Sequence, residues 1–212
     1  MSASPLRWFG WACLMACSSA NARPPVYVRS DILPVVNDRE KTWTQARTPL
    51  ELNAGQASNC SSYARLKPSG IRDEGHNQLV KSEYQICDVL AQLDKSAKLE
   101  PLSATNYGAA LASRLDLRTF RSSLRPRMDE DDDTLSSLFG GEVRIEREAA
   151  VVENQDRFFS LTVVVVGDFD QSGVTDWLVW VSDEIPAGTF RAYQTLLIKD
   201  VPPDGLLRAE SL

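Results

Sequence analysis

The pattern of apolar and polar positions divides the chain into a helical first part and a second part with strand periodicity. Between residues 48 and 125 the pattern is mainly helical or irregular. The clearest predicted helix covers 77–97, and a second covers 106–115. The apolar stripe of the first helix consists of Leu79, Ile86, Val89, Leu90 and Leu93. The expected fold class is α+β, with a helical N-terminal half packed against a C-terminal antiparallel sheet.

Four strands are expected in the second part, which runs from 141 to 212. The segment 142–152 alternates apolar and polar residues, as does a strand with one solvent-facing side. The segment 156–166 ends in a run of valines and is expected to be a central strand buried on both faces. Strands 176–182 and 189–199 complete the antiparallel set.

The first 22 residues have the pattern of an export signal. Their apolar run, 8–16, is less than half of the ~20 residues that are needed to cross a bilayer. Two cleavage interpretations remain open. The run Leu14-Met15-Ala16-Cys17 resembles a bacterial lipobox with Cys17 as the lipidated residue, whereas Ala20-Asn21-Ala22 fits ordinary signal peptidase. The expected location is the periplasm, and Ser18 after the cysteine resembles lipoproteins sent to the outer membrane.

The rest of the chain is predicted to have three regions after a tether. Residues 23–47 begin with Arg-Pro-Pro and are expected to hold the body away from the anchor. Residues 48–128 form the helical, disulfide-bridged region, and 129–140 form an acidic linker that opens with five adjacent carboxylates. Residues 141–212 form the antiparallel β region.

Cysteine usage agrees with an exported chain. Two of the four cysteines lie in the signal region, so Cys60 and Cys87 remain in the folded body. In an oxidising compartment they are expected to pair, and two buried thiols are the alternative. The single histidine, His76, is expected in an exposed loop. One histidine and no third thiol do not support a transition-metal centre.

Oxygen ligands converge in the stretch from Gly167 to Trp180. Counting Asp168 as position 1, side-chain oxygens occupy positions 1, 3, 5 and 9, a glycine occupies position 6, and a backbone carbonyl is available at position 7. These residues are Asp168, Asp170, Ser172, Asp176, Gly173 and Val174. This is the ligand order of a short loop that folds around a hard cation, so Ca2+ is the expected cofactor. Position 12 is Val179 and not glutamate, which argues against an EF-hand. The alternative is an acidic hairpin turn without metal.

This loop resembles the Asp-rich calcium loop of FG-GAP or VCBS repeats, known from integrin-type propellers and exported bacterial proteins. The matching residues are Gly167, Asp168, Phe169, Asp170, Gly173, Asp176, Leu178 and Val179. Gln171 stands where glycine is usual, and Ser172 stands where aspartate or asparagine is usual. The missing anionic ligand implies a weaker site, and a single copy does not imply a propeller.

Composition and motifs favour a binding protein over an enzyme. The formal net charge of -6 argues against nucleic acid or an anionic membrane surface as partner. The chain has no Gly-x-Ser-x-Gly motif, and the adjacent carboxylates Asp183 and Glu184 would point to opposite faces of a strand. We therefore expect no enzymatic activity, and a membrane contact only through the N-terminal lipid.

The combination of signal, cysteine pair and calcium-stabilised strands resembles the periplasmic immunity lipoproteins that bacteria keep against lysozyme-like toxins. This resemblance implies a protein partner, such as a basic wall hydrolase or toxin, which an acidic inhibitor would attract. The contact surface is expected to combine the calcium loop with the 183–189 connection, including Asp183, Glu184 and Phe190. The alternative is a structural or peptidoglycan-associated envelope lipoprotein.

Overall fold

The structure is a computed structural model that describes residues 24–72, 75–125 and 133–212. In these ranges the main strands are β1 (Val26–Val28), β4 (Leu99–Pro101), β5 (Arg144–Ile145), β6 (Ala149–Glu153), β7 (Phe158–Gly167), β8 (Asp176–Glu184), β9 (Arg191–Ile198) and β10 (Glu210–Ser211). The helices are α1 (Leu33–Asn37), α2 (Arg39–Thr44), α3 (Cys60–Leu66), α4 (Gly75–Ser82), α5 (Gln85–Gln92), α6 (Tyr107–Arg114) and α7 (Leu135–Phe139). A separate hairpin joins β2 (Leu50–Leu52) and β3 (Gly55–Ala57).

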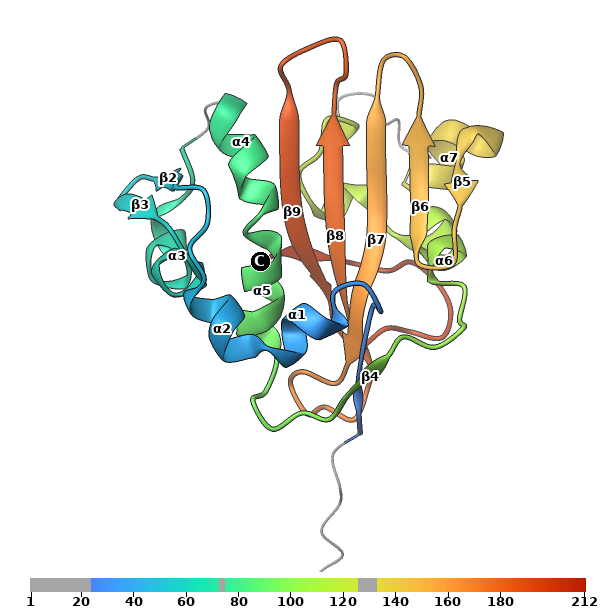
Figure 1. The fold of residues 1–212 in the computed structure, drawn as a ribbon. Helices are drawn as coiled ribbons and strands as arrows, with labels where there is room; N and C mark the ends of the chain where they lie inside the picture. The colour runs from blue at the N-terminus through green and yellow to red at the C-terminus, as the bar shows by residue number, and fades with distance from the viewer. Residues whose placement is uncertain (1–23, 73–74, 126–132) are drawn as a thin grey trace, which may run out of the picture.

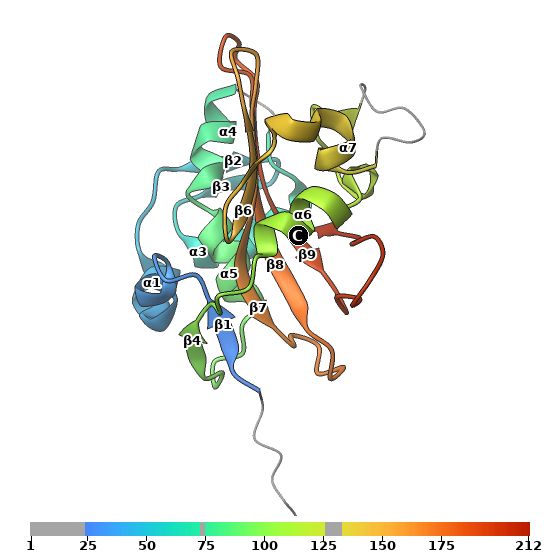
Figure 2. The same cartoon turned by 90° about the vertical axis from the view of Figure 1, so that its right-hand side faces the viewer.

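The main sheet is mostly antiparallel and has helices on both faces (Figure 1, Figure 2). Its order is β10-β9-β8-β7-β1-β4, and β6 pairs with the first half of β7 and carries β5 on its other side. Only β1 and β4 are parallel among these pairs. The expected α+β class is confirmed. No helix in the described residues has the length and apolar character of a membrane span.

The central strand β7 is buried on both faces, as its run of valines predicts. A bulge between Val163 and Val165 shifts the register with β8. Val163 and Val166 therefore belong to one apolar cluster, whereas Val164 and Val165 belong to the other. The first cluster lies under α6, and the second lies under α3 and α5. Helices cover both sides of the strand, which explains why its second half, from Val163 to Val166, is continuously apolar.

The predicted tether is wrong for the residues that the structure describes, because 24–47 is part of the fold. Val26 and Val28 are buried, and β1 pairs with the end of β7 beyond the reach of β6. On α2, the Arg39 guanidinium donates to the carbonyls of Leu90 and Leu93 at 2.7 and 2.6 Å. These carbonyls lie at the end of α5, where no further turn of helix supplies N–H donors for them, so Arg39 takes the place of those donors.

The single helix predicted over 77–97 is two helices, α4 and α5. The helix breaks at Tyr84, whose buried hydroxyl lies within hydrogen-bond distance of the carbonyls of Thr48 and Ala57, at 2.8 and 2.9 Å. Leu79 is 47% exposed, so it does not belong to an apolar stripe shared with α5. His76 is exposed, but it lies on α4 and not in a loop. The predicted helix over 106–115 is confirmed as α6, with Asn106 as its N-cap.

The strand predicted over 142–152 is a hairpin formed by β5 and β6. Helix α6 packs backbone to backbone against its turn, since Gly108 N–H donates to the Arg147 carbonyl at 3.1 Å. A Cβ atom at Gly108 would lie 2.1 Å from the Glu146 carbonyl oxygen, so any larger residue would push the helix away.

The predicted acidic linker over 129–140 is wrong for its described part. Residues 129–132 lie outside the described residues, but Thr134 and Ser137 form a reciprocal cap that starts α7. Leu135 is fully buried beneath it. This segment is therefore anchored in the core.

Cys60 on α3 and Cys87 on α5 form the disulfide that the sequence predicts. The Cα atoms are 5.0 Å apart, and both side chains are buried in the cluster that α5 forms with the sheet. The bridge therefore ties the outer helical layer to the helix that packs on β8 and β9.

Candidate metal site

The candidate metal site lies in the loop 168–175 that joins β7 to β8. One carboxylate oxygen from each of Asp168, Asp170 and Asp176 lies within 4.8 Å of the others. Calcium binds oxygen at 2.3–2.6 Å, so two ligands on opposite sides of one ion are roughly 4.8 Å apart. The three carboxylates therefore fit a single hard cation without a large movement of the loop.

The backbone of the loop holds these carboxylates inward. Ser172 N–H lies 3.0 Å from an oxygen of both Asp168 and Asp170, and Gly173 N–H donates to Asp168 at 2.9 Å. The turn requires positive φ at Gln171 (65°) and at Gly173 (85°). Gln171 occupies the position where the resembling repeats have glycine, and its left-handed backbone gives the physical reason for that preference.

Asp176 anchors the loop to the sheet. It is only 1% exposed, and its two carboxylate oxygens accept backbone N–H groups from Phe169 at 2.8 Å and from Asp200 at 2.9 Å. These donors come from opposite sides of the loop. Asp176 thus has a structural role in addition to any role as a ligand.

Asp200 is a neighbour of the site that the sequence pattern missed. Its carboxylate accepts a hydrogen bond from Ser172 Oγ at 2.7 Å, and its own backbone has a φ of 46°. The residue follows β9, and Ile198 pairs with Trp177, so the strand register brings it beside the loop. Only that register could have revealed it. Val174 is 43% exposed, and its N–H lies 3.3 Å from Ser172 Oγ.

The electrostatic field around the loop is negative. Lys199 is near enough to Asp170 and Asp176 to interact with them electrostatically. Its ammonium, however, pairs with Glu210 at 2.6 Å. The pKa of Lys199 is raised mainly by the hydrogen bond to Glu210, with smaller contributions from Asp170 and Asp176. The lysine is thus largely committed elsewhere, and the carboxylates retain a charge that attracts a cation.

Comparisons with protein-family models, with curated proteins and with solved structures found no match. The function is therefore argued from the geometry of the molecule.

Asp183 is wrong as a residue of the predicted partner surface. Asp183 is fully buried and accepts hydrogen bonds from the Ser123 backbone N–H and hydroxyl at 2.6 and 2.7 Å. Glu184 is bound by Arg191, and Phe190 alone of the three is well exposed, at 41%.

These residues also lie at the opposite end of β8 from the metal loop (Figure 1). The length of β8 separates the two ends by roughly 26 Å, at ~3.3 Å per residue. A contact that includes both loops would therefore have to extend along the whole strand.

A hollow of about 500 Å³ lies directly beside the metal loop. Its apolar wall includes Val26, Leu93 and Phe169, and Asp168 and Gly173 contribute the loop side. The loop that could hold a metal therefore also shapes one wall of this hollow.

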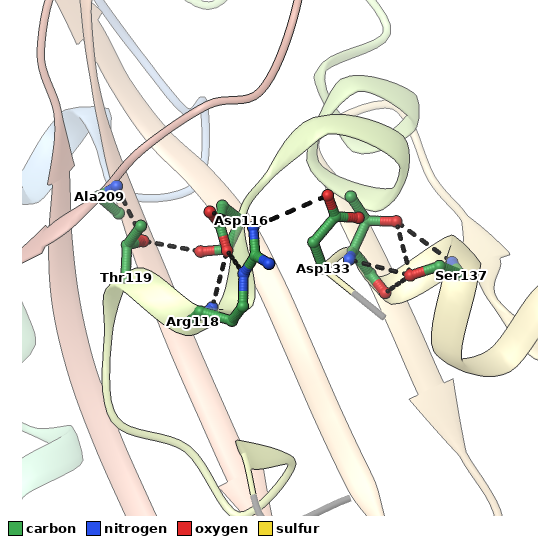
Figure 3. Close-up of polar contacts among 7 residues, drawn as sticks. Asp116, Arg118, Thr119, Asp133, Ser137 and Ala209 are labelled. Atoms are coloured by element: carbon green, nitrogen blue, oxygen red, sulfur yellow. Dashed lines mark hydrogen bonds and ion pairs between the residues drawn. The ribbon is translucent and has the colours of Figure 1, made fainter. Parts of the chain in front are cut away.

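A second acidic group, Asp116, belongs to a contact network that fixes the fold (Figure 3). Its carboxylate accepts hydrogen bonds from the Arg118 backbone and guanidinium at 2.8–3.0 Å, and the Arg118 hydrogen bond is the main cause of its lowered pKa. Thr119 connects this turn to the C-terminal segment, because its hydroxyl donates to the Asp116 carbonyl and accepts from Ala209 N–H. The network joins distant segments, and among the described residues it includes no group of three acidic side chains suited to a cation.

Proposed function

We propose that this protein is an exported, calcium-binding protein that acts by binding another protein and not by catalytic turnover. The observation that carries the proposal is the convergence of Asp168, Asp170 and Asp176 in a loop at one end of a firmly packed sheet. Asp168, Asp170, Ser172, Asp176 and the Val174 carbonyl would hold the ion.

The donor set favours calcium over other biological cations. All of the expected ligands are oxygens, which argues against zinc or copper. Magnesium requires near-ideal octahedral geometry at 2.0–2.1 Å, whereas calcium accepts irregular sets of six to eight oxygens. A loop that mixes carboxylates, one hydroxyl and one carbonyl suits the more permissive ion. Three carboxylates and the absence of a bidentate glutamate favour the weak affinity of extracellular modules.

The partner is proposed to be a basic wall-degrading hydrolase or toxin, which this protein would neutralise as a periplasmic immunity protein. The chain has a formal net charge of -6, so it would steer a basic enzyme toward itself. The loop is joined to two buried strands, so it would lose little conformational entropy when it docks. We place the contact at the metal loop and the hollow beside it.

The test is to recover the partner from periplasm and to titrate it calorimetrically. An inhibitor should co-purify with one hydrolase at a one-to-one ratio and abolish its activity. Asp168→Asn with Asp170→Asn should weaken both calcium and partner binding, whereas Asp156→Asn should change neither. Asp156 is the matched control, because it is exposed in the turn at the other end of β7.

Sedimentation of the protein with purified cell walls, without a hydrolase partner, would instead support the structural envelope role. The location is tested separately, because Cys17 and both cleavage positions lie outside the described residues. Mass spectrometry of the mature N-terminus would find a lipid on Cys17 if the lipobox is used.

A further inference from the structure

The outer edge of β9 is unpaired over half of its length. β9 pairs with β8 throughout, but β10 pairs only with Leu196 and Leu197, and Leu212 N–H then donates to the Thr195 carbonyl. Outward-facing backbone groups alternate along a strand, so Tyr193 and Arg191 present their N–H and C=O groups on the same side as Thr195. In the described chain no strand covers this stretch.

This free edge lies at the bottom of a groove of about 700 Å³. Gln78 and Lys81 on α4 form one side of it, and residues 121–123 form the other. The Gln194 side chain connects β9 to the second side of the groove, because its amide donates a hydrogen bond to the Arg121 carbonyl at 2.6 Å. In Figure 1 the upper half of β9 runs beside α4, while the C-terminus reaches only its lower half. Helix α4 and residues 121–123 flank the edge on its two sides, which opposes edge-to-edge pairing of two whole sheets.

The groove carries positive charge on an otherwise acidic protein. Arg121 is exposed on its wall, and no hydrogen bond or ion pair of its guanidinium occurs among the described residues. Lys81 and Lys67 share the single carboxylate of Asp88, with Nζ–oxygen distances of 3.2 and 2.5 Å. Both ammonium groups are thus bound within the protein, and Arg121 supplies the unpaired positive charge on the groove wall among the described residues.

Two further groups lie on the groove wall. Ser122 Oγ, also on the groove wall, is buried and has no hydrogen-bond partner in the described chain. Arg191 contributes less, because Glu184 pairs with it at 3.1 Å.

We propose that the β9 groove binds an extended peptide segment with acidic side chains, which adds to the sheet as a further strand. The peptide would exchange backbone hydrogen bonds with Tyr193 and Arg191, and its carboxylates would face Arg121. Backbone pairing supplies affinity in this mode of recognition, and alternate side chains supply specificity. This site is independent of the metal loop and of the proposed hydrolase partner.

The test begins with a phage-displayed library of random 12-residue peptides selected on the purified protein in EDTA. The expected result is enrichment of sequences with Asp or Glu at alternate positions. A selected peptide, labelled and titrated by fluorescence polarisation, should bind Arg121→Glu ~tenfold or more weakly, because a charge-assisted contact is lost. Arg65→Glu should bind as the wild type does, since Arg65 is exposed on α3 and does not line the groove.

A scan of N-methylated peptides gives a second readout that depends on no protein variant. Methylation at every second backbone nitrogen should weaken binding by ~tenfold, while methylation at the intervening nitrogens should not, because only alternate N–H groups face the strand. Selection of no peptide, or of peptides whose affinity is indifferent to Arg121→Glu, would overturn the proposal. A methylation scan without a period of two would overturn it as well.

Discussion

The substitution Asp170→Asn separates the metal from the architecture of the loop. Asp170 is exposed, and the one hydrogen bond shown for its carboxylate comes from Ser172 N–H at 3.0 Å, which an amide oxygen can still accept. The stability without calcium should therefore change by no more than about 0.5 kcal/mol. The calcium affinity should fall about tenfold or more, because one of the anionic ligands becomes neutral.

The magnitude follows from linkage between binding and unfolding. At a free calcium concentration ~100-fold above Kd, the wild type gains ~2.7 kcal/mol of unfolding free energy. A tenfold weaker variant at the same concentration gains only ~1.4 kcal/mol. For a chain of this size, 1 kcal/mol moves Tm by ~2–4 °C, so we expect shifts of roughly 5–11 °C and 3–6 °C.

The assay is thermal denaturation in calcium and in EDTA, with isothermal titration to obtain Kd. Asp156→Asn is the control, because it removes the same charge from an exposed turn at the other end of the sheet. It should keep the full calcium shift. A wild type whose Tm is the same in millimolar calcium and in EDTA would refute the metal site. Equal calcium shifts for wild type and Asp170→Asn would remove Asp170 from the ligand set.

Three other changes have distinct expected results. Asp176→Asn should lower the unfolding free energy by ~1–3 kcal/mol even in EDTA, because the new amide nitrogen would face one of the two backbone N–H donors. Urea titration measures the loss, and an unchanged urea midpoint would contradict the prediction. Replacing both Cys60 and Cys87 by Ser should cost about 3.5 kcal/mol in the chain-entropy model for a separation of 27 residues, and a loss below ~1 kcal/mol in the same titration would show that the bridge is dispensable. Asp116 has a folded pKa below its ordinary value of 3.8, so its contribution is complete above that value and is lost as the pH falls through the lowered pKa. Asp116→Asn should therefore be less stable than the wild type at about pH 6 and differ less at about pH 3.

The sequence by itself determined the elements whose periodicity is local. The valine run of β7, the alternation in the second half of β8 and the capped helix α6 are recognisable, because each signal lies within the element itself. The convergence of Asp168, Asp170 and Asp176 was also predictable, since their spacing places them within one turn. The disulfide was predicted from the cysteine count and the expected oxidising compartment.

The tertiary structure decided everything that depends on contacts between distant segments. The sequence alone predicts a tether for the first described residues. In the structure, Val26 and Val28 are part of a strand because β1 pairs with the end of β7. The break at Tyr84 is set by carbonyls that lie more than twenty residues earlier in the chain. Asp183 was expected on the surface, but the strand register buries it. The same register brings Asp200, which the sequence pattern missed, beside the loop 168–175. The local pattern indicates which residues are buried. Only long-range packing decides which segments they are buried against.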